Sequence, residues 1–134
     1  MEKLENGIVV DTNVLIKFLR GDSQAIELLG KLRTENILYT TDINAFELYY
    51  GAYKGIKQDE NLAAVKGIIN SLILLGTNED CMEIAGKILV DLQKKGKGIE
   101  IRDLFIGSIC LVNSLKLLTL NKKHFEIIEG LKLV

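Results

Sequence analysis

The stretch that most constrains the fold runs from residue 8 to residue 13 and reads Ile-Val-Val-Asp-Thr-Asn. Three consecutive β-branched residues predict a short strand that is buried on both of its faces. The apolar spacing of Leu15, Phe18 and Leu19 predicts an amphipathic helix directly after it. Asp11 therefore stands at the carboxyl end of a central strand, where open α/β sheets place their ligands. A charge at that position is costly unless a cationic group compensates it.

Asp11 also has a simpler interpretation. Asp and Thr are both favoured at helix N-caps, so the only role of Asp11 and Thr12 could be to begin the following helix. This stretch alone leaves both interpretations open, and the acids further along the chain bear on the choice.

The composition predicts one compact domain over residues 1–134. Hydrophobic residues make up 48% of the chain and charged residues 26%, and the mean hydropathy is +0.20, which excludes a disordered chain. The net charge is −1 and the pI is about 5.9, so the chain has no broad basic surface for nucleic acid. Any nucleic-acid contact must depend on a local patch or on bound metal.

The sequence gives no signal for export or for a membrane. Residues 1–6 are acidic and lead into only three apolar residues, which excludes a signal peptide. The longest apolar stretch, residues 68–75, is interrupted by polar residues and is too short to span a bilayer. Cys81 and Cys110 fall in apolar helical patterns and predict buried thiols in a reducing compartment. We therefore expect a cytoplasmic protein.

Strand patterns alternate with helix patterns along the chain, and glycine, in the absence of proline, separates them. This order predicts an α/β fold of three layers, with a central, mostly parallel sheet of four to five strands flanked by helices. The predicted strands cover residues 8–10, 37–41, 72–75, 116–120 and 131–134. The predicted helices begin near residues 12, 22, 42, 59, 77, 103 and 121.

Some of these assignments depend on single residues. Asp42 is the predicted cap of the helix after the second strand. The core face of that helix is predicted to consist of Ile43, Phe46, Tyr50 and Tyr53. Thr77 with Asp80 forms a capping signature for a later helix. Residues 72–75 are expected to form a buried strand, with helix as the alternative.

Three acids stand in apolar surroundings: Asp11, Glu47 and Asp103. Taken singly, Glu47 could be a solvated helix residue and Asp103 another cap. In a right-handed parallel sheet, however, all three lie near the carboxyl edge. Carboxylates that converge repel one another, so the arrangement predicts Mg²⁺ or Mn²⁺, which suits phosphate-ester hydrolysis.

Four motifs, in this order and spacing, resemble the pattern of PIN-domain ribonucleases, and most closely that of the VapC toxins of prokaryotic toxin–antitoxin pairs. The resemblance covers essentially the whole chain. The motifs are Asp11-Thr12-Asn13 after an apolar strand, residues 45–52 (Ala-Phe-Glu-Leu-Tyr-Tyr-Gly-Ala), residues 102–107 (Arg-Asp-Leu-Phe-Ile-Gly) and residues 118–125 (Leu-Thr-Leu-Asn-Lys-Lys-His-Phe).

The resemblance implies a role for each matched polar residue. Asp11, Glu47 and Asp103 are implied to be the catalytic acids that hold the divalent metal, and Thr12 and Asn13 to orient Asp11. The implied reaction is metal-dependent hydrolysis of RNA that leaves a 5′-phosphate.

The chain departs from the family pattern after its fourth strand. Thr119 is implied to line the pocket, but the region from Asn121 to His124, where relatives often carry Asp, holds no carboxylate. Asn121 could ligate a metal through its carbonyl oxygen without adding charge, and we include it among the catalytic residues. His124, the only histidine, could contact a phosphate or protonate a leaving group, or simply pack beside Phe125.

Two basic clusters flank the predicted pocket. A solvated helix exit explains the first, and RNA-backbone contact is the alternative for both. They consist of Lys94, Lys95 and Lys97, and of Lys122 and Lys123.

The predicted function is that of an endoribonuclease toxin, with RNA as substrate, a VapB-like antitoxin as partner and a homodimer as the assembly that the resemblance implies. An antitoxin peptide or helix would lie in an apolar groove. The candidate groove residues are Leu15, Phe18, Leu19, Tyr49, Tyr50 and Tyr53, for which core packing is the alternative.

Two other functions compete with this prediction. A non-catalytic PIN-like module that binds RNA or protein would keep the fold without cleavage, and the missing fourth acid favours it. A phosphoacceptor signalling domain also uses a strand-end Asp with Mg²⁺. That domain needs a phosphorylatable Asp at the end of the middle strand, where this chain has residues 76–78, Gly-Thr-Asn.

Overall fold

The fold is built on a parallel sheet of four strands in the order β3-β2-β1-β4, as seen in a computed structural model that describes residues 6–134. The strands are β1 Gly7–Val10, β2 Ile37–Thr41, β3 Ile73–Leu75 and β4 Lys116–Leu118. The predicted last strand is reduced to a single parallel bridge between Leu117 and Leu133. The predicted α/β class with a parallel sheet flanked by helices is confirmed.

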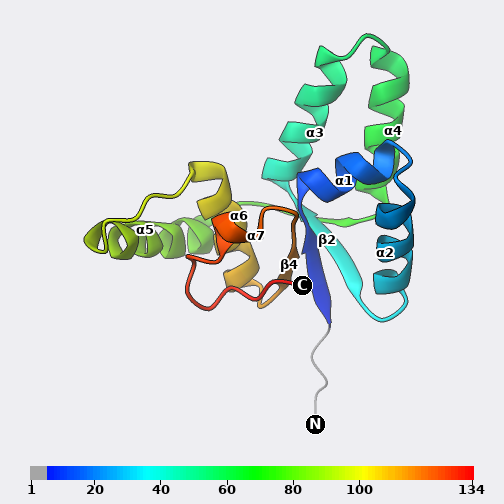
Figure 1. The fold of residues 1–134 in the computed structure, drawn as a ribbon. Helices are drawn as coiled ribbons and strands as arrows, with labels where there is room; N and C mark the ends of the chain where they lie inside the picture. Colours follow the sequence, from blue (N-terminus) through cyan, green and yellow to red (C-terminus); the bar gives the residue numbers. More distant parts are fainter. Residues whose placement is uncertain (1–5) are drawn as a thin grey trace.

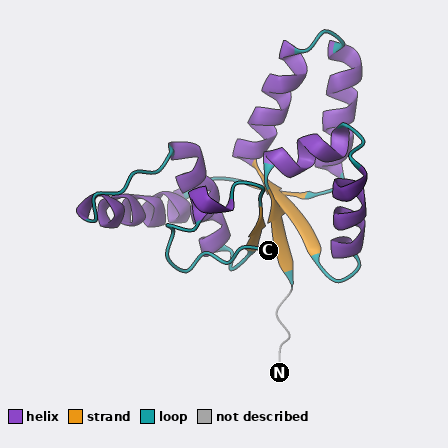
Figure 2. Ribbon diagram, viewed as in Figure 1, coloured by secondary structure: helices purple, strands orange, loops and turns teal. Residues whose placement is uncertain are grey.

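Helices cover the sheet on two sides (Figures 1 and 2). In Figure 1, α1 to α4 lie to the right of the sheet and above it, and α5 to α7 lie to its left. The helices are α1 Thr12–Leu19, α2 Ser23–Arg33, α3 Asp42–Lys54, α4 Gln58–Asn70, α5 Glu79–Lys94, α6 Ile101–Val112 and α7 Lys122–Phe125. None of them, within the described residues, has the length and apolar character needed to cross a membrane.

The central strand β1 is buried on both faces, as its sequence predicts. Ile8 and Val10 point into the core cluster beneath α1 to α4, whereas Val9 points into the cluster that contains Ile106 of α6 and Phe125 of α7. This alternation follows from the two-residue period of a strand. Because β1 is buried on both faces, the packing around it fixes the position of Asp11, the residue that follows the strand.

Both cysteines are buried and free, as predicted. Burial raises the pKa of the Cys110 thiol to about 12, and the charge of Asp11 adds to the effect. A thiol with that pKa holds almost no thiolate at neutral pH, so Cys110 is an inert core residue.

Two predicted helix caps are wrong, and the residues concerned bond to each other instead. Thr41 caps α3, and Asn78 caps α5 by accepting from the Cys81 amide at 3.0 Å. Asp42 accepts hydrogen bonds at 3.0 Å from both the amide and the hydroxyl of Thr77. The pair therefore ties the start of α3 to the loop after β3.

The predicted core face of α3 is also wrong, because three of its aromatic residues point to solvent. Phe46, Tyr50 and Tyr53 are 67%, 56% and 58% exposed, and the rings of Phe46 and Tyr50 stack at 6.2 Å. The buried side of α3 consists of Asn44, Ala45, Leu48 and Ala52. Both sets have helical spacing, and the smaller set allows close approach of α4 and α1.

The third strand is not buried as predicted. Ile73 and Leu74 are 49% and 48% exposed, because β3 is the edge strand of the sheet beside β2.

Candidate functional site

Asp11 serves both as a helix cap and as a buried charge at the sheet edge. Its backbone is extended, and its Oδ1 accepts a hydrogen bond from the Thr12 amide at 2.8 Å, which begins α1. Its Oδ2 accepts from the Thr119 hydroxyl at 2.7 Å, just beyond β4. Since Asp11 is completely buried, these donors and a neighbouring cation stabilise its charge. The two interpretations of Asp11 are therefore compatible.

Glu47 is a paired residue of α3 rather than a solvated one. Its Oε1 accepts a hydrogen bond from the Thr12 hydroxyl at 2.6 Å. Its side chain is 30% exposed, so it lies at the boundary between the network around Asp11 and solvent. The start of α1 thus links the first acid to the second through Thr12.

Asp103 lies in the first turn of α6 and not at its N-cap, which is Glu100. Its side chain is 3% exposed. An acidic residue in a first turn is favoured by the helix dipole, which offsets part of the cost of burying this charge. The three predicted acids thus come from the end of β1, from α3 and from the start of α6.

A guanidinium that the sequence analysis assigned no role joins the three acids. Arg102 Nη2 donates to Asp11 Oδ1 at 2.9 Å and to Glu47 Oε1 at 2.7 Å. Its Nε donates to Glu47 Oε2 at 2.9 Å, and its Nη1 donates to Asp103 Oδ1 at 2.8 Å. Burial alone would lower the pKa of Arg102, but the hydrogen bonds to Glu47, Asp11 and Asp103 hold it above its ordinary value.

Asn44 is a second residue that sequence reasoning missed. It is completely buried, and its Nδ2 donates to Asp11 Oδ1 at 2.9 Å and to Thr12 Oγ1 at 2.8 Å. Its Oδ1 accepts from the Thr41 hydroxyl at 2.7 Å within the capping box of α3. The only sequence signal is an Asn one turn before Glu47, next to a possible cap, and that signal is weak.

The other predicted residues contribute unequally. The side-chain Oδ1 of Asn13 accepts from the Leu120 amide at 3.2 Å, and its Nδ2 lies 3.5 Å from the Thr119 hydroxyl. Asn13 therefore reaches Asp11 only through Thr119. Asn121 is exposed and donates its backbone amide to the Thr119 hydroxyl at 3.1 Å, while its side chain forms no cap for α7.

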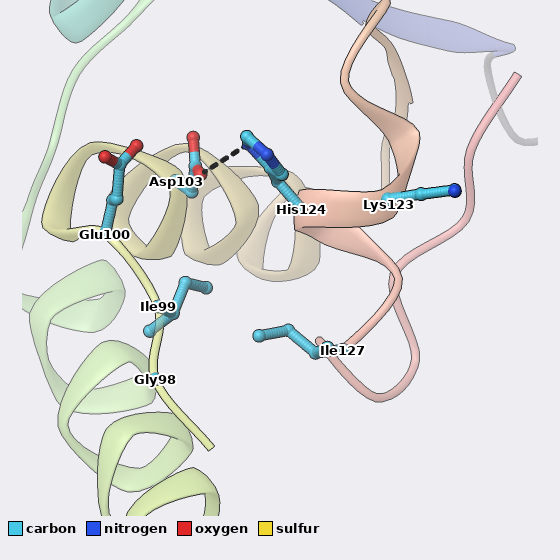
Figure 3. A pocket seen from close by; sticks show the side chains of 7 residues that line it. All are labelled: Gly98, Ile99, Glu100, Asp103, Lys123, His124 and Ile127. Carbon is cyan, nitrogen blue, oxygen red and sulfur yellow. Dashed lines mark ion pairs between the residues drawn. The ribbon is translucent and has the colours of Figure 1, made fainter.

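A pocket of about 500 Å³ opens on the other side of Asp103 (Figure 3). Its lining residues are Gly98, Ile99, Glu100, Asp103, Lys123, His124 and Ile127. His124 Nδ1 lies 3.8 Å from Asp103 Oδ2, the ion pair that Figure 3 marks. Ligand atoms of Glu100, Asp103 and His124 all lie within 4.8 Å of one another. Glu100 was not among the predicted site residues.

Comparison with known proteins identifies the family of the chain. Residues 8–130 match the PIN domain model. The tRNA(fMet)-specific endonuclease VapC of Salmonella typhimurium is 29% identical over 125 residues, which cover 93% of this chain and 94% of that protein. Ribonuclease VapC3 of Methanocaldococcus jannaschii is 33% identical over 101 residues, 75% of this chain and 95% of that protein.

Solved structures show the same fold. VapBC2 from Rickettsia felis, bound to a DNA fragment from its promoter, has a chain that is 25% identical and superposes with a TM-score of 0.88, covering 96% of this chain and 97% of that one. DNA-bound VapBC from Salmonella typhimurium contains a chain that is 28% identical, with a TM-score of 0.87 and the same coverage. The chain belongs to the PIN-domain family and, within it, to the VapC proteins.

Proposed function

We propose that this protein is a metal-dependent endoribonuclease and the toxin of a toxin–antitoxin pair. The observation that carries the proposal is the convergence of Asp11, Glu47 and Asp103, from three separate elements, on one positively charged group. The named activities of the VapC relatives, ribonuclease and tRNA-specific endonuclease, support RNA as the substrate class.

The donor set fits a hard divalent cation. Three carboxylates, two of them buried, supply the anionic oxygens that Mg²⁺ and Mn²⁺ prefer. We assign Asp11, Glu47 and Asp103 as its ligands. A divalent ion held there would lower the pKa of a bound water and stabilise charge on the scissile phosphate.

The surrounding residues of this chain hold the carboxylates ready. Asn44 and Thr119 fix the two oxygens of Asp11, and Thr12 fixes Glu47, so the acids need little reorganisation when substrate binds. His124 and Lys123 line the open pocket, from which they can reach a phosphate that approaches Asp103. We assign Asn121 a positioning role, in place of the predicted catalytic one, because its backbone amide donates to the Thr119 hydroxyl.

A non-catalytic PIN-like module that binds RNA or protein remains the second candidate. One observation favours it: Arg102 already compensates the three acids, and the region from Asn121 to His124 adds no carboxylate. This module would bind RNA or a partner but would not cleave when metal is added.

The partner that we propose is a VapB-like antitoxin, since the structural relatives are VapBC complexes. Of the predicted groove residues, Leu15 is a core residue, whereas Tyr50 and Tyr53 are exposed and available to a partner. We further propose a homodimer and, because the substrate is RNA, a cytoplasmic location.

Cleavage of a total tRNA and rRNA pool tests the proposed activity. The purified protein would be assayed with Mg²⁺, with Mn²⁺ and with EDTA, beside Asp11→Asn, Asp103→Asn and an Asp91→Asn control in an exposed position on α5. We expect metal-dependent cutting by the wild type and the control, products with 5′-phosphates, and no cutting by the two site variants. Metal binding without cutting by the wild type would favour the non-catalytic module.

A further inference from the structure

The Arg102 guanidinium contacts all three acids and fills the position that a divalent metal ion would need. Both oxygens of Glu47 accept hydrogen bonds from its guanidinium, at 2.7 and 2.9 Å. Asp11 and Asp103 each contribute Oδ1 to the same group. A divalent ion that used Glu47 together with these two oxygens would need the positions that Arg102 nitrogens now fill.

The position of Arg102 in its own helix does not explain its conformation. A positive charge in the first turn of α6 faces the positive end of the helix dipole, which is unfavourable. The Glu100 side chain forms no cap hydrogen bond that would offset this charge. The stabilisation of Arg102 therefore comes from the three acids.

One guanidinium neutralises only part of the charge of three carboxylates. A single positive charge among three negative ones leaves an excess of negative charge, which a divalent ion would reduce further. The Arg102 side chain is 26% exposed, so rotation about its flexible stem can carry the guanidinium into water without movement of α6.

We infer that Arg102 is an internal counter-cation that the divalent metal must displace, so that its contacts with Asp11, Glu47 and Asp103 and the binding of metal by these acids exclude one another. The inference rests on the proposed metal site. Arg102 thereby sets the metal affinity of the site: it stabilises the fold when metal is scarce and lowers the affinity for metal.

Titration calorimetry with Mn²⁺ on the full chain tests this competition. We expect Arg102→Gln to bind Mn²⁺ at least about tenfold more tightly than the wild type, because the competing charge is gone. The matched control is Lys123→Gln, which removes one positive charge from the adjacent pocket. Lys123 is suitable because, in the part of the chain that the structure describes, it forms no ion pair. The control should change the affinity by no more than about threefold.

NMR of the arginine Nε–H groups gives a second readout that needs no variant. The chain has three arginines, Arg20, Arg33 and Arg102, so the signals of Arg20 and Arg33 serve as internal controls for the Arg102 signal. In EDTA the Arg102 Nε–H should show the shift of a carboxylate-bound group. Saturation with Mg²⁺ should move that signal alone to the position of a solvated arginine.

The possible outcomes separate the inference from the proposed function. Equal Mn²⁺ affinity of Arg102→Gln, Lys123→Gln and the wild type, or an Arg102 signal that Mg²⁺ leaves unchanged, would overturn the competition while the metal site stands. If neither the wild type nor Arg102→Gln bound Mn²⁺, the metal site itself would be wrong, and the inference with it.

Discussion

The two sides of the Asp103 carboxylate differ sharply. On what we call the inner side, Asp11, Glu47 and Arg102 form contacts of 2.6 to 2.9 Å with one another and with Thr12 and Asn44. The outer side is formed by Glu100, Lys123 and His124. There His124 Nδ1 lies 3.8 Å from Asp103 Oδ2, and the His124 side chain is 59% exposed. The inner side holds its charges in short hydrogen bonds, whereas the outer side leaves room for a ligand.

Acid-to-amide substitutions on the two sides should give the largest difference in the rate of RNA cleavage. We expect Asp11→Asn to lower RNA cleavage by at least about a thousandfold, because it removes a metal-binding charge from the inner side. Glu100→Gln, on the outer side, should lower it by less than about tenfold. Single-turnover cleavage rates at saturating Mg²⁺ measure both. Similar losses for the two variants would contradict the distinction between the sides.

Removal of the Asn44 amide should destabilise the fold more than removal of the Asn113 amide, which lies at the C-cap of α6. Asn44→Ala removes one donor to the buried Asp11 carboxylate, the donor to the Thr12 hydroxyl and the acceptor of the Thr41 hydroxyl. We expect a loss of about 3 kcal/mol in the free energy of unfolding. Asn113→Ala, which removes one bond to the Ile109 carbonyl, should cost about 1 kcal/mol or less. Urea denaturation gives both values, and equal costs would show that the inner network has no special role.

His124 should matter modestly for rate and little for stability. We expect His124→Ala to reduce cleavage by about three- to tenfold, since the imidazole lies in the open pocket and adds at most one contact to substrate. The free energy of unfolding should change by less than about 0.5 kcal/mol, as is usual for exposed residues. Cleavage rates and urea denaturation are the measurements. A loss above a hundredfold would make His124 a catalytic acid or base.

The smallest effect should come from Lys123, which lines the pocket on the outer side, and from its neighbour in the sequence, Lys122. The double change Lys122→Gln with Lys123→Gln should weaken RNA binding a few-fold and reduce the slope of log affinity against log salt by about 1.4, or about 0.7 per charge on single strands. Lys17→Gln, on the exposed surface of α1, is the control. An unchanged slope for the double variant would remove this cluster from the RNA interface.

The sequence predicted the inner side in part. The parallel topology brings Asp11, Glu47 and Asp103 to one edge of the sheet, and strand and helix periodicity was enough to infer that topology. Arg102 could not be found in this way, because two of its three partners lie 55 and 91 residues away in the sequence. Its place in the first turn of α6 suggests only an unfavourable helix start. Asn44 was missed because polar residues on a helix are ordinarily exposed.

The errors elsewhere have a common physical cause. In α3, aromatic and small residues occupy helical stripes of equal periodicity, so spacing alone does not decide which stripe faces the core. Large side chains were assigned to the core, whereas close helix packing selected the small ones. The caps of α3 and α5 shifted by one residue for a related reason: Thr41, Asp42, Thr77 and Asn78 are all good cap residues, and tertiary contacts chose among them.

The most direct test of the central claim, that the inner acids hold the catalytic metal, is a crystal structure with Mn²⁺ located by its anomalous scattering. We predict a single strong peak within coordination distance of Asp11, Glu47 and Asp103, with the Arg102 guanidinium turned away from all three. A peak between Glu100, Asp103 and His124, with Arg102 still bound to Asp11 and Glu47, would contradict it and place the cation on the outer side.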